Sequence, residues 1–387
     1  MKNYWKLVKI GDIGEVVGGG TPSTKCSDYY GGDIPWITPK DLSNFRNRYI
    51  SRGERMISKL GLENSSARML PPFSVLFTSR APIGYIAIAK NELCTNQGFK
   101  SIIPDPKKCN ALFLYYLLKY KKNDIELIAN GSTFQEVSGT ALKNFEVSIP
   151  PLDEQGKIAA ILSALDDKIE LNNKINRNLE AQAQAIFKSW FIDFEPFKNG
   201  KFIDSELGKI PEGWSIGTIG DISIISTGKR PDKRSTYKSN ETPIPIIGAS
   251  SIMGYTNKVL YDEKMLVTGR VGTHGIIQKI DFPCWPSDNT LVLKSKNLNF
   301  LHNCLLLINW KSMNRGSTQP LITQNDLKNT RIILPQDRII QNYEQIVHCF
   351  DIKFYNNNKE IYVLSQLRDI LLPKLLSGEI DVTKITV

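Results

Sequence analysis

Basic and hydroxyl-bearing side chains gather in several loops of this chain. One group follows a glycine run and consists of Thr21, Ser23 and Lys25. A second group places four cations within six residues: Lys229, Arg230, Lys233 and Arg234. Lysine and arginine contact phosphates, and arginine, serine and threonine also hydrogen-bond to base edges. These loops therefore predict contact with a nucleic acid.

Further candidates for such contacts lie in polar turns. Arg80 precedes Gly84, and Arg270 precedes Gly272, so the backbone there can approach a ligand closely. The others carry hydroxyl, amide, imidazole or ammonium groups: Thr38, Lys40, Asn96, Gln97, Lys100, Ser132, Thr133, Gln135, His274, Ser317, Thr318 and Gln319. Each of them alone is also what a solvated surface or a structural turn presents. The prediction therefore rests on the set.

The sequence carries no recognisable catalytic motif. It has no GxxxxGK[ST] loop, GxSxG elbow or HExxH pair. The run Gly18–Gly20 resembles a phosphate-cradling loop, but no helix is expected after Pro22, which favours a tight turn. Asp166 and Asp167 are expected on the solvated face of a helix. Six cysteines without a CxxC pair and three histidines argue against a zinc site. We expect no catalytic residue, metal or cofactor in this chain.

Composition points to a polyanionic partner. The 387 residues carry a net charge of +10, which favours nucleic acid before an anionic membrane. No apolar run approaches the roughly 18 residues of a membrane span. Lysines and Asp12 interrupt the N-terminal stretch in which a signal peptide would be apolar. We expect a cytoplasmic protein of two or three domains.

The chain presents these loops twice, because its sequence repeats itself. The segments GST at 131–133, LKN at 142–144 and Pro150 recur at 316–318, 327–329 and Pro335, an offset of 185 (316 − 131). IGDI at 10–13 recurs at 219–222, an offset of 209 (219 − 10). LFTSR at 76–80 matches LVTGR at 266–270, an offset of 190 (266 − 76). The falling offset predicts extra residues in copy one, chiefly between Pro39 and Pro71.

Each copy is expected to begin with a compact domain dominated by strands. Short β-rich runs at 74–78, 85–89 and 100–103 are separated by glycine and proline. One helical segment is expected at 111–121, with a counterpart at 300–309. The density of glycine and proline argues against a doubly wound sheet.

A long amphipathic helix is expected to end each copy. Its core positions recur every seven residues: Ile158, Leu165, Asn172, Leu179 and Ile186 in copy one, and Phe350, Asn357, Leu364 and Leu371 in copy two. Such heptads bury their stripes against another helix, and a pseudo-two-fold axis makes the pair antiparallel. The equivalent residues Asn172 and Asn357 are expected to meet near that axis and to set the register. The alternative is that both face solvent.

The predicted fold class is α+β, with two pseudo-symmetric, strand-rich α/β domains separated by two long antiparallel coiled-coil helices. The expected segments are 1–151 for the first domain, 152–197 for the central helix, 198–336 for the second domain, 337–377 for the C-terminal helix and 378–387 for a tail.

The ordered combination of motifs resembles the specificity subunits of Type I restriction–modification systems. The matching segments span nearly the whole chain: IGDI at 10–13, GGTPS at 19–23, TSRAPIG at 78–84, TNQGF at 95–99, PPL at 150–152 with Glu154, Gln155 and Ile158, and DSELG at 204–208 with Gly213-Trp214. Copy two departs from this pattern. Its glycine stretch becomes Gly228-Lys229-Arg230-Pro231, and Glu154-Gln155 is not retained.

That resemblance implies a non-catalytic subunit whose two domains are target recognition domains. Each would read one half of an asymmetric, bipartite site in double-stranded DNA. The helices would be conserved spacers that fix the distance between the half-sites and dock two methyltransferase subunits. S-adenosylmethionine, ATP and Mg are implied on partner subunits, which would methylate adenine and, in the restriction/translocase subunits, move along and cleave DNA.

Two other functions stay open. The chain could be a protein-interaction scaffold that binds partners through its helices and does not read DNA. It could also be a fused methyltransferase-nuclease, although no cofactor-binding domain is expected.

Overall fold

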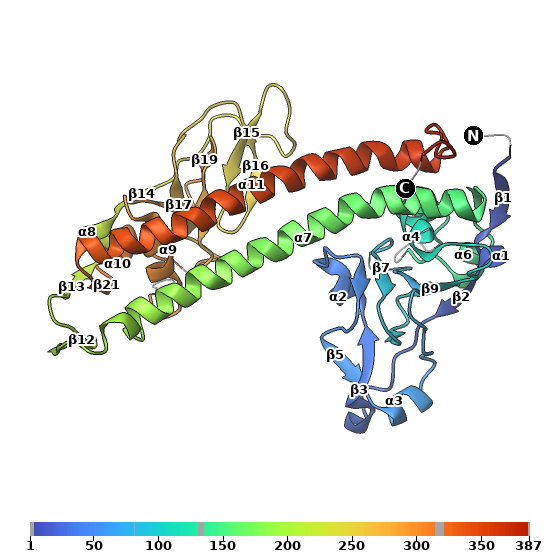
Figure 1. Ribbon diagram of the computed structural model, residues 1–387, viewed down its shortest axis with the longest axis horizontal. Helices are drawn as coiled ribbons and strands as arrows, with labels where there is room; N and C mark the ends of the chain where they lie inside the picture. Colours follow the sequence, from blue (N-terminus) through green and yellow to red (C-terminus); the bar gives the residue numbers. More distant parts are fainter. Residues whose placement is uncertain (1–3, 81, 131–134, 314–320, 386–387) are drawn as a thin grey trace. The chain divides into compact units, whose positions relative to one another are not determined.

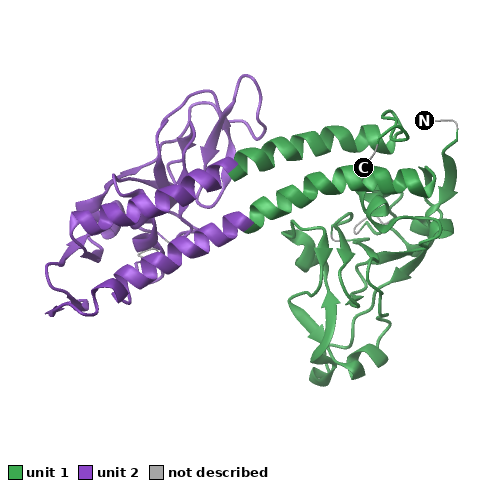
Figure 2. Cartoon of the chain, viewed as in Figure 1, with its two compact units in different colours: residues 1–174, 357–387 green, residues 175–356 purple. Residues whose placement is uncertain are grey.

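The computed structural model describes residues 4–80, 82–130, 135–313 and 321–385. It divides into two compact units, unit 1 with residues 1–174 and 357–387 and unit 2 with residues 175–356 (Figure 2). Each unit contains one strand-rich domain and part of each of two long helices (Figure 1). The predicted α+β class with two strand-rich domains is therefore confirmed.

The domain of unit 1 holds two small sheets and a two-stranded ribbon. The sheets have the orders β2-β9-β6-β7-β4 and β5-β3-β8, and β1 pairs with β10. The strands are β1 Lys6–Lys9, β2 Gly14–Gly18, β3 Tyr30–Ile37, β4 Tyr49–Ile50, β5 Arg55–Ile57, β6 Val75–Phe77, β7 Ile86–Ala89, β8 Cys94–Thr95, β9 Lys100–Pro104 and β10 Glu146–Ile149. The helices are α1 Ile10–Ile13, α2 Pro39–Ser43, α3 Lys59–Glu63, α4 Ala111–Tyr120, α5 Lys122–Leu127 and α6 Gly139–Lys143.

The core of this domain explains its secondary structure. Strand β6 is a short, fully buried apolar run, which is typical of a central strand. Helix α4 starts at Asn110, whose side chain accepts a hydrogen bond from the Phe113 amide. Its buried residues pack over β7 and β6. The predicted strands β6, β7 and β9 and the predicted helix α4 are confirmed.

The domain of unit 2 repeats this plan with fewer elements. Its sheets have the orders β14-β20-β17-β18 and β16-β15-β19, β13 pairs with β21, and β11 pairs with β12. The strands are β11 Phe202–Ser205, β12 Gly208–Pro211, β13 Ser215–Thr218, β14 Ile224–Thr227, β15 Ile244–Ile247, β16 Ile252–Thr256, β17 Met265–Gly269, β18 Gln278–Ile280, β19 Trp285–Pro286, β20 Thr290–Lys294 and β21 Arg331–Leu334. The helices are α8 Ile219–Ile222, α9 Leu298–Leu306 and α10 Gln324–Lys328.

Strand pairing shows how the two copies correspond. Val75 pairs with Ile102, and Leu266 pairs with Leu293, so the offset here is 191 (266 − 75 and 293 − 102). The predicted match of residues 76–80 with 266–270, at an offset of 190, is therefore wrong by one residue. Both faces of these strands are apolar and buried, so side-chain alternation does not reveal a slip of one residue.

The length difference between the copies lies where the offsets predict it. Trp36 pairs with Cys94 on β8, and Ile246 pairs with Trp285 on β19, an offset of 210 (246 − 36). The offset has fallen to 191 at Val75. The intervening segment of unit 1 contains α2, β4 and α3, which have no counterparts in the described residues of unit 2.

The two long helices are α7 Leu152–Phe191 and α11 Asp337–Leu376, each of 40 residues and about 60 Å at 1.5 Å per residue. Their parts within unit 1 run antiparallel. Arg368 contacts Asp166 at 2.8 Å, and Asn172 contacts Glu360 at 2.8 Å, so the residue numbers rise on one helix as they fall on the other.

The predicted core positions of the helices are buried or half-buried. Ile158, Asn172 and Asn357 are buried, and the others are half-buried: Leu165, Leu179, Ile186, Phe350, Leu364 and Leu371. Asn172 and Asn357 each expose only 1% of their surface, so neither faces solvent. Asn172 donates to Glu360, which is one helical turn from Asn357. A direct meeting of the two asparagines stays a prediction.

Asp166 corrects one sequence interpretation. It was expected on the solvated face of α7, but it is 5% exposed and accepts a hydrogen bond from the Tyr116 hydroxyl at 2.7 Å. Arg368 neutralises its charge. Solvation therefore does not explain this carboxylate, whose partner residues lie far away in the sequence. Its neighbour Asp167 is exposed, as expected, and pairs with Arg48.

Candidate nucleic-acid interface

The glycine loops after β2 and β14 are tethered in the same way in both units. The Gly20 amide donates to the Thr95 carbonyl of β8, which pairs with β3. The amide of Lys229, the equivalent residue at an offset of 209 (229 − 20), donates to the Pro286 carbonyl of β19, which pairs with β15. The carbonyl of Gly20 accepts the indole N–H of Trp36 at 2.9 Å, and the carbonyl of Lys229 accepts that of Trp285 at 2.6 Å. The tether fixes where each loop starts and therefore where its polar side chains emerge.

The glycines serve this packing. A Cβ atom on Gly19 would lie 1.9 Å from the Asn96 carbonyl oxygen, and one on Gly228 would lie 2.1 Å from the Ser287 carbonyl oxygen. Only glycine lets the two backbones approach so closely. The glycines of these loops therefore allow close packing of one backbone against another.

The loop of unit 1 presents a modest polar surface. Ser23 and Lys25 are exposed, and the Lys25 amide donates to the Ser23 hydroxyl at 3.4 Å. Thr21 is half-buried, and its hydroxyl has no hydrogen-bond partner among the described residues. An unsatisfied buried hydroxyl is costly, so a ligand that supplied a partner would gain affinity there.

A carboxylate gathers two of the predicted cations of unit 1. Glu136 contacts Arg80 at 3.4 Å and Lys100 at 3.2 Å, and Gln135 is exposed beside it. The sequence reasoning did not select Glu136. Its charge restrains both cations until a phosphate or base competes for them.

Two predicted residues of unit 1 have structural roles. Thr38 caps α2: its amide and hydroxyl bond to the Asp41 carboxylate at 2.7 and 2.6 Å. Lys40 pairs with Glu54 at 2.6 Å on the surface. A phosphate would have to displace these carboxylates to contact Thr38 or Lys40.

The turn after β8 shapes a second polar loop. The Asn96 side chain accepts from the Gly98 amide at 2.9 Å, which leaves Gln97 exposed at the tip. Gly84 has a φ of +87°, a left-handed conformation that favours glycine. Asn96 and Gly84 therefore hold turns, whereas Gln97 is free to reach outward.

Unit 2 has a polar cleft of about 470 Å³ beside its glycine loop. Its polar lining consists of Arg230, Asp232, Arg234, Ser287, Asp288 and Asn289. Ser287, Asp288 and Asn289 follow β19 in the same way as Asn96 and Gln97 follow β8 (287 − 96 = 191). Aligning the two copies at this offset could have identified these three residues from the sequence. The Ser287 hydroxyl is buried without a partner among the described residues. Guanidinium, amide and carboxylate groups together can distinguish base edges.

The cations that line this cleft, Arg230 and Arg234, and the neighbouring Lys229 and Lys233 differ in how strongly they are engaged. Lys233 pairs with Glu241 at 2.8 Å, and Arg234 donates to the Met253 carbonyl at 3.1 Å. Lys229 and Arg230 are exposed and have no ion pair among the described residues. Arg230 is therefore the cation of the cleft that is freest to meet a ligand.

Arg270 takes the backbone position of Ser79, not that of Arg80. The amides of Ser79 and Arg270 donate at 2.8 Å to the carbonyls of Gly98 and Asn289, which are themselves equivalent (289 − 98 = 191). The Arg270 side chain is half-buried, and its Nε has no partner among the described residues.

The remaining predicted positions fall into two groups. His274 is half-buried, and its Nδ1 lies 3.0 Å from the Gly272 carbonyl oxygen within a turn. Five candidates lie outside the described residues: Ser132, Thr133, Ser317, Thr318 and Gln319.

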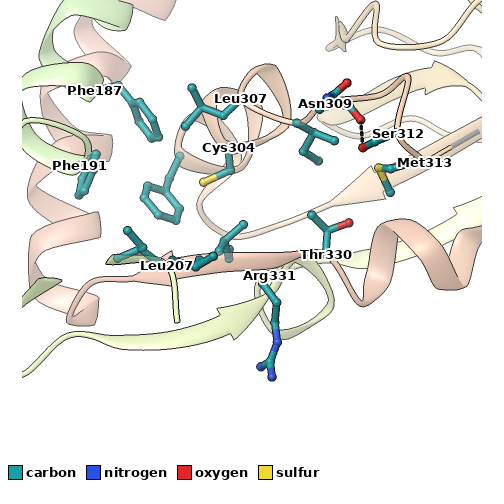
Figure 3. A pocket seen from close by; sticks show the side chains of 14 residues that line it. Phe187, Phe191, Leu207, Cys304, Leu307, Asn309, Ser312, Met313, Thr330 and Arg331 are labelled. Carbon is teal, nitrogen blue, oxygen red and sulfur yellow. Dashed lines mark hydrogen bonds between the residues drawn. The ribbon is translucent and has the colours of Figure 1, made fainter. Parts of the chain in front are cut away.

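An apolar cavity of unit 2 has a different character. It measures about 320 Å³ and is lined by Phe187 and Phe191 of α7, by Cys304 and by residues of β21 (Figure 3). Arg331 is the single charged residue in its described lining, and its side chain points away from the cavity to pair with Glu206 at 3.4 Å.

Three of the cysteines are buried and unsuited to thiol chemistry. Burial raises the pKa of Cys94, Cys109 and Cys284 to about 12, so these thiols are protonated at neutral pH and are poor nucleophiles. Within the described ranges, no three histidine, cysteine, aspartate or glutamate side chains cluster as metal ligands would. None of the described helices is long and apolar enough to cross a membrane.

Known proteins share this architecture. The family model for the Type I restriction modification DNA specificity domain matches twice, at residues 2–181 and 211–366. The specificity subunit of the Type I restriction enzyme MjaIX from Methanocaldococcus jannaschii is 42% identical, over 98% of this chain and 94% of that protein. The HindI specificity subunit of Haemophilus influenzae is 24% identical, over 88% of this chain and 89% of that protein.

A solved structure has the same fold. The S subunit of a Type I restriction-modification system from M. genitalium aligns with a TM-score of 0.60 and 18% identity, over 97% of both chains. The two family-model matches each cover most of one strand-rich domain and the greater part of one long helix. The chain therefore belongs to the family of Type I restriction-modification specificity subunits.

Proposed function

We propose that the chain is the DNA-reading subunit of a Type I restriction–modification complex. Each strand-rich domain reads one half of an asymmetric, bipartite site in double-stranded DNA. The observation that carries this proposal is the pair of glycine loops, which have the same backbone tether but present different side chains. Two loops that share one backbone attachment but carry different side chains are suited to recognising two different DNA sequences.

The charges of the loops support a DNA ligand. The chain carries a net charge of +10, and the loop of unit 2 concentrates Lys229, Arg230, Lys233 and Arg234. Cations of this kind bind phosphates and give affinity that falls steeply with salt. The hydroxyl and amide groups around them, such as Ser23, Gln97 and Asn289, supply contacts to base edges.

The helices supply docking surfaces for catalytic partners. Helix α11 exposes four large apolar side chains on one face in unit 1: Tyr362, Val363, Leu367 and Ile370. The residues 185 positions earlier in α7 are polar or small: Arg177, Asn178, Gln182 and Ala185. Contiguous exposed apolar surface on a helix is typical of a protein interface. We assign it to a modification subunit, and S-adenosylmethionine, ATP and Mg to the partners of this cytoplasmic subunit.

The same apolar face also favours the second candidate function, a protein-interaction scaffold that does not read DNA. The two candidates differ in one measurable property, the dependence of modification on DNA sequence.

The test is methylome sequencing of a restriction-free host that expresses the chain together with its modification subunits. We expect methylated adenines in one bipartite, asymmetric motif. Arg80→Ala should relax only the half-site read by unit 1, and Arg230→Ala only the half-site read by unit 2. Lys209→Ala, which removes an exposed lysine of β12, is the matched control and should leave the motif unchanged.

Equal relaxation of both half-sites by either variant would contradict modular reading. Co-purification of the partners without any sequence-dependent methylation would favour the scaffold.

A further inference from the structure

Unit 1 contains a second polar cleft, distinct from the glycine loops. It measures about 380 Å³ and lies where the segment between α2 and β4, strand β7 and helix α4 meet α7 and α11. Six polar residues line it: Arg46, Asn47, Lys119, Asn173, Ser365 and Arg368. All of them belong to unit 1. None of the residues that line the cleft is a carboxylate, so its described walls are cationic or neutral.

The cations of this cleft are not equally available. Arg368 already pairs with Asp166 and Asp369, both at 2.8 Å. Arg46 is exposed, and neither it nor Lys119 forms an ion pair with any described residue. Arg46 on one wall and Lys119 on another are therefore the cations of the cleft that have no ion pair among the described residues.

The position of Lys119 is energetically unfavourable for a charged side chain. It is half-buried in the last turn of α4, 6.0 Å from the ring centre of Tyr115. Burial and the nearby Arg368 lower the pKa of its ammonium group. The carboxylates of Asp166 and Asp369 oppose this lowering of the pKa, but neither forms an ion pair with Lys119 among the described residues. A partly buried cation that lacks a direct ion pair destabilises the fold unless a ligand or partner compensates it. An anion in the cleft would restore the interactions that burial removes.

We propose that this cleft binds a phosphoryl group. Its donors approach from three separate walls: Arg46 before β4, Lys119 on α4, and Ser365 with Arg368 on α11. A phosphoryl group offers oxygens in three or more directions, whereas a carboxylate offers two in one plane, so the phosphoryl group matches this arrangement better. The group could belong to the DNA backbone or to a free phosphorylated molecule. The inference requires no sequence-specific reading by either domain.

The test titrates the full-length chain with inorganic pyrophosphate and follows binding by 31P NMR. We expect saturable binding that Lys119→Gln weakens about tenfold, the effect of losing one charge-assisted contact. Lys119→Arg, which keeps the charge, should retain most of the affinity. Lys90→Gln is the matched control, because Lys90 is an exposed lysine of the same unit outside the cleft.

A second arm identifies the source of the group. Binding of a non-specific 20-base-pair duplex is measured against salt concentration. If Lys119→Gln also reduces the salt slope by about 0.9, one phosphate contact, the DNA backbone is the ligand. If only pyrophosphate binding falls, a free phosphorylated molecule is the ligand. Unchanged pyrophosphate affinity in Lys119→Gln, or binding of a polyglutamate peptide but not of pyrophosphate, would overturn the proposal.

Discussion

Polar contacts are prominent where the strand-rich domain of unit 1 meets the long helices, whereas a cluster of aromatic rings is prominent in unit 2. In unit 1 the Tyr116 hydroxyl donates to Asp166, and buried Arg48 pairs with Asp167 and Glu170 of α7. Gln155 bonds to the amide of Asn110 and to two carbonyls, those of Lys108 and Pro150.

In unit 2 the corresponding junction is a cluster of rings. Phe300 of α9 packs 5.0 Å from Phe191 and 5.8 Å from Phe187 of α7, and Phe191 lies 5.2 Å from Tyr343 of α11. Polar contacts also join this domain to α11: Glu344 accepts from the Phe300 amide at 2.8 Å, and Asn303 donates to the Tyr343 hydroxyl at 3.0 Å. Asp351, the equivalent of Asp166 (351 − 166 = 185), accepts from Asn299 at 2.7 Å.

The difference teaches that a repeat can keep its architecture while it exchanges the forces that maintain it. Directional hydrogen bonds fix an orientation, and apolar contacts supply more of the free energy. The two junctions should therefore respond differently to mutation and to pH.

The largest effect is expected from Phe300→Ala. Removing a fully buried ring should destabilise unit 2 by about 3–5 kcal/mol, because the cavity left between α9 and α7 cannot close completely. Hydrogen–deuterium exchange measured by mass spectrometry should show faster exchange in α9 and β21. Leu306→Ala, an exposed leucine of the same helix, should change stability by no more than about 0.5 kcal/mol. Equally faster exchange in α4 would show that the two junctions are not independent.

Acid should weaken unit 2, because this unit contains the half-buried imidazole of His302. Burial lowers the pKa of His302 on α9 to about 4, below the ordinary value of 6.5. The unfolded chain therefore takes up the proton first. The stability that the neutral imidazole contributes is complete above about pH 6.5 and is lost as the pH falls towards 4, by up to about 3 kcal/mol.

The measurement is the guanidinium unfolding midpoint between pH 7 and pH 4.5. His302→Leu should flatten the acid-dependent decline, and His348→Leu, which changes an exposed histidine of α11, should not. An unchanged pH profile in His302→Leu would remove this distinction between the units.

A smaller loss is expected from Arg48→Met. This change keeps the apolar stem and removes the guanidinium group that bonds to Glu170, to Asp167 and to the Ser163 carbonyl. We expect a loss of about 1.5–3 kcal/mol, because Arg48 is buried although Asp167 is largely exposed. Lys279→Met, which breaks the exposed pair with Asp351 in unit 2, should cost at most about 1 kcal/mol. Equal losses would contradict a larger polar contribution to the junction of unit 1 than to that of unit 2.

The sequence predicted the periodic and duplicated features of the fold. Heptads predicted the helices, and the repeated GST and LKN segments predicted the two copies, because periodicity and sequence identity can be recognised without knowledge of the three-dimensional structure. The site was less accessible. The buried strands β6 and β17 allowed a one-residue slip, so Arg80 was aligned with Arg270, although Ser79 is the residue that corresponds.

The sequence also did not predict that equivalent hydrogen bonds in the two units are made by side chains from different strands. Trp36 lies on β3, whereas Trp285 lies on β19, the strand that pairs with the counterpart of β3. Both indoles satisfy equivalent carbonyls. Glu136 and Asp288 were missed for a similar reason, since carboxylates are not expected beside a polyanion until the neighbouring cations are seen.

Because an indole is hydrogen-bonded to each glycine loop, tryptophan fluorescence should report on the conformation of that loop. Trp36 and Trp285 are buried, and each donates its N–H to the backbone of the loop that is proposed to meet DNA. A ligand that shifts either carbonyl would alter the polarity around that ring and therefore its fluorescence. Tryptophan-to-phenylalanine variants at the other four positions, Trp5, Trp190, Trp214 and Trp310, would isolate these two signals. Occupancy of each half-site could then be followed in real time without a chemical label.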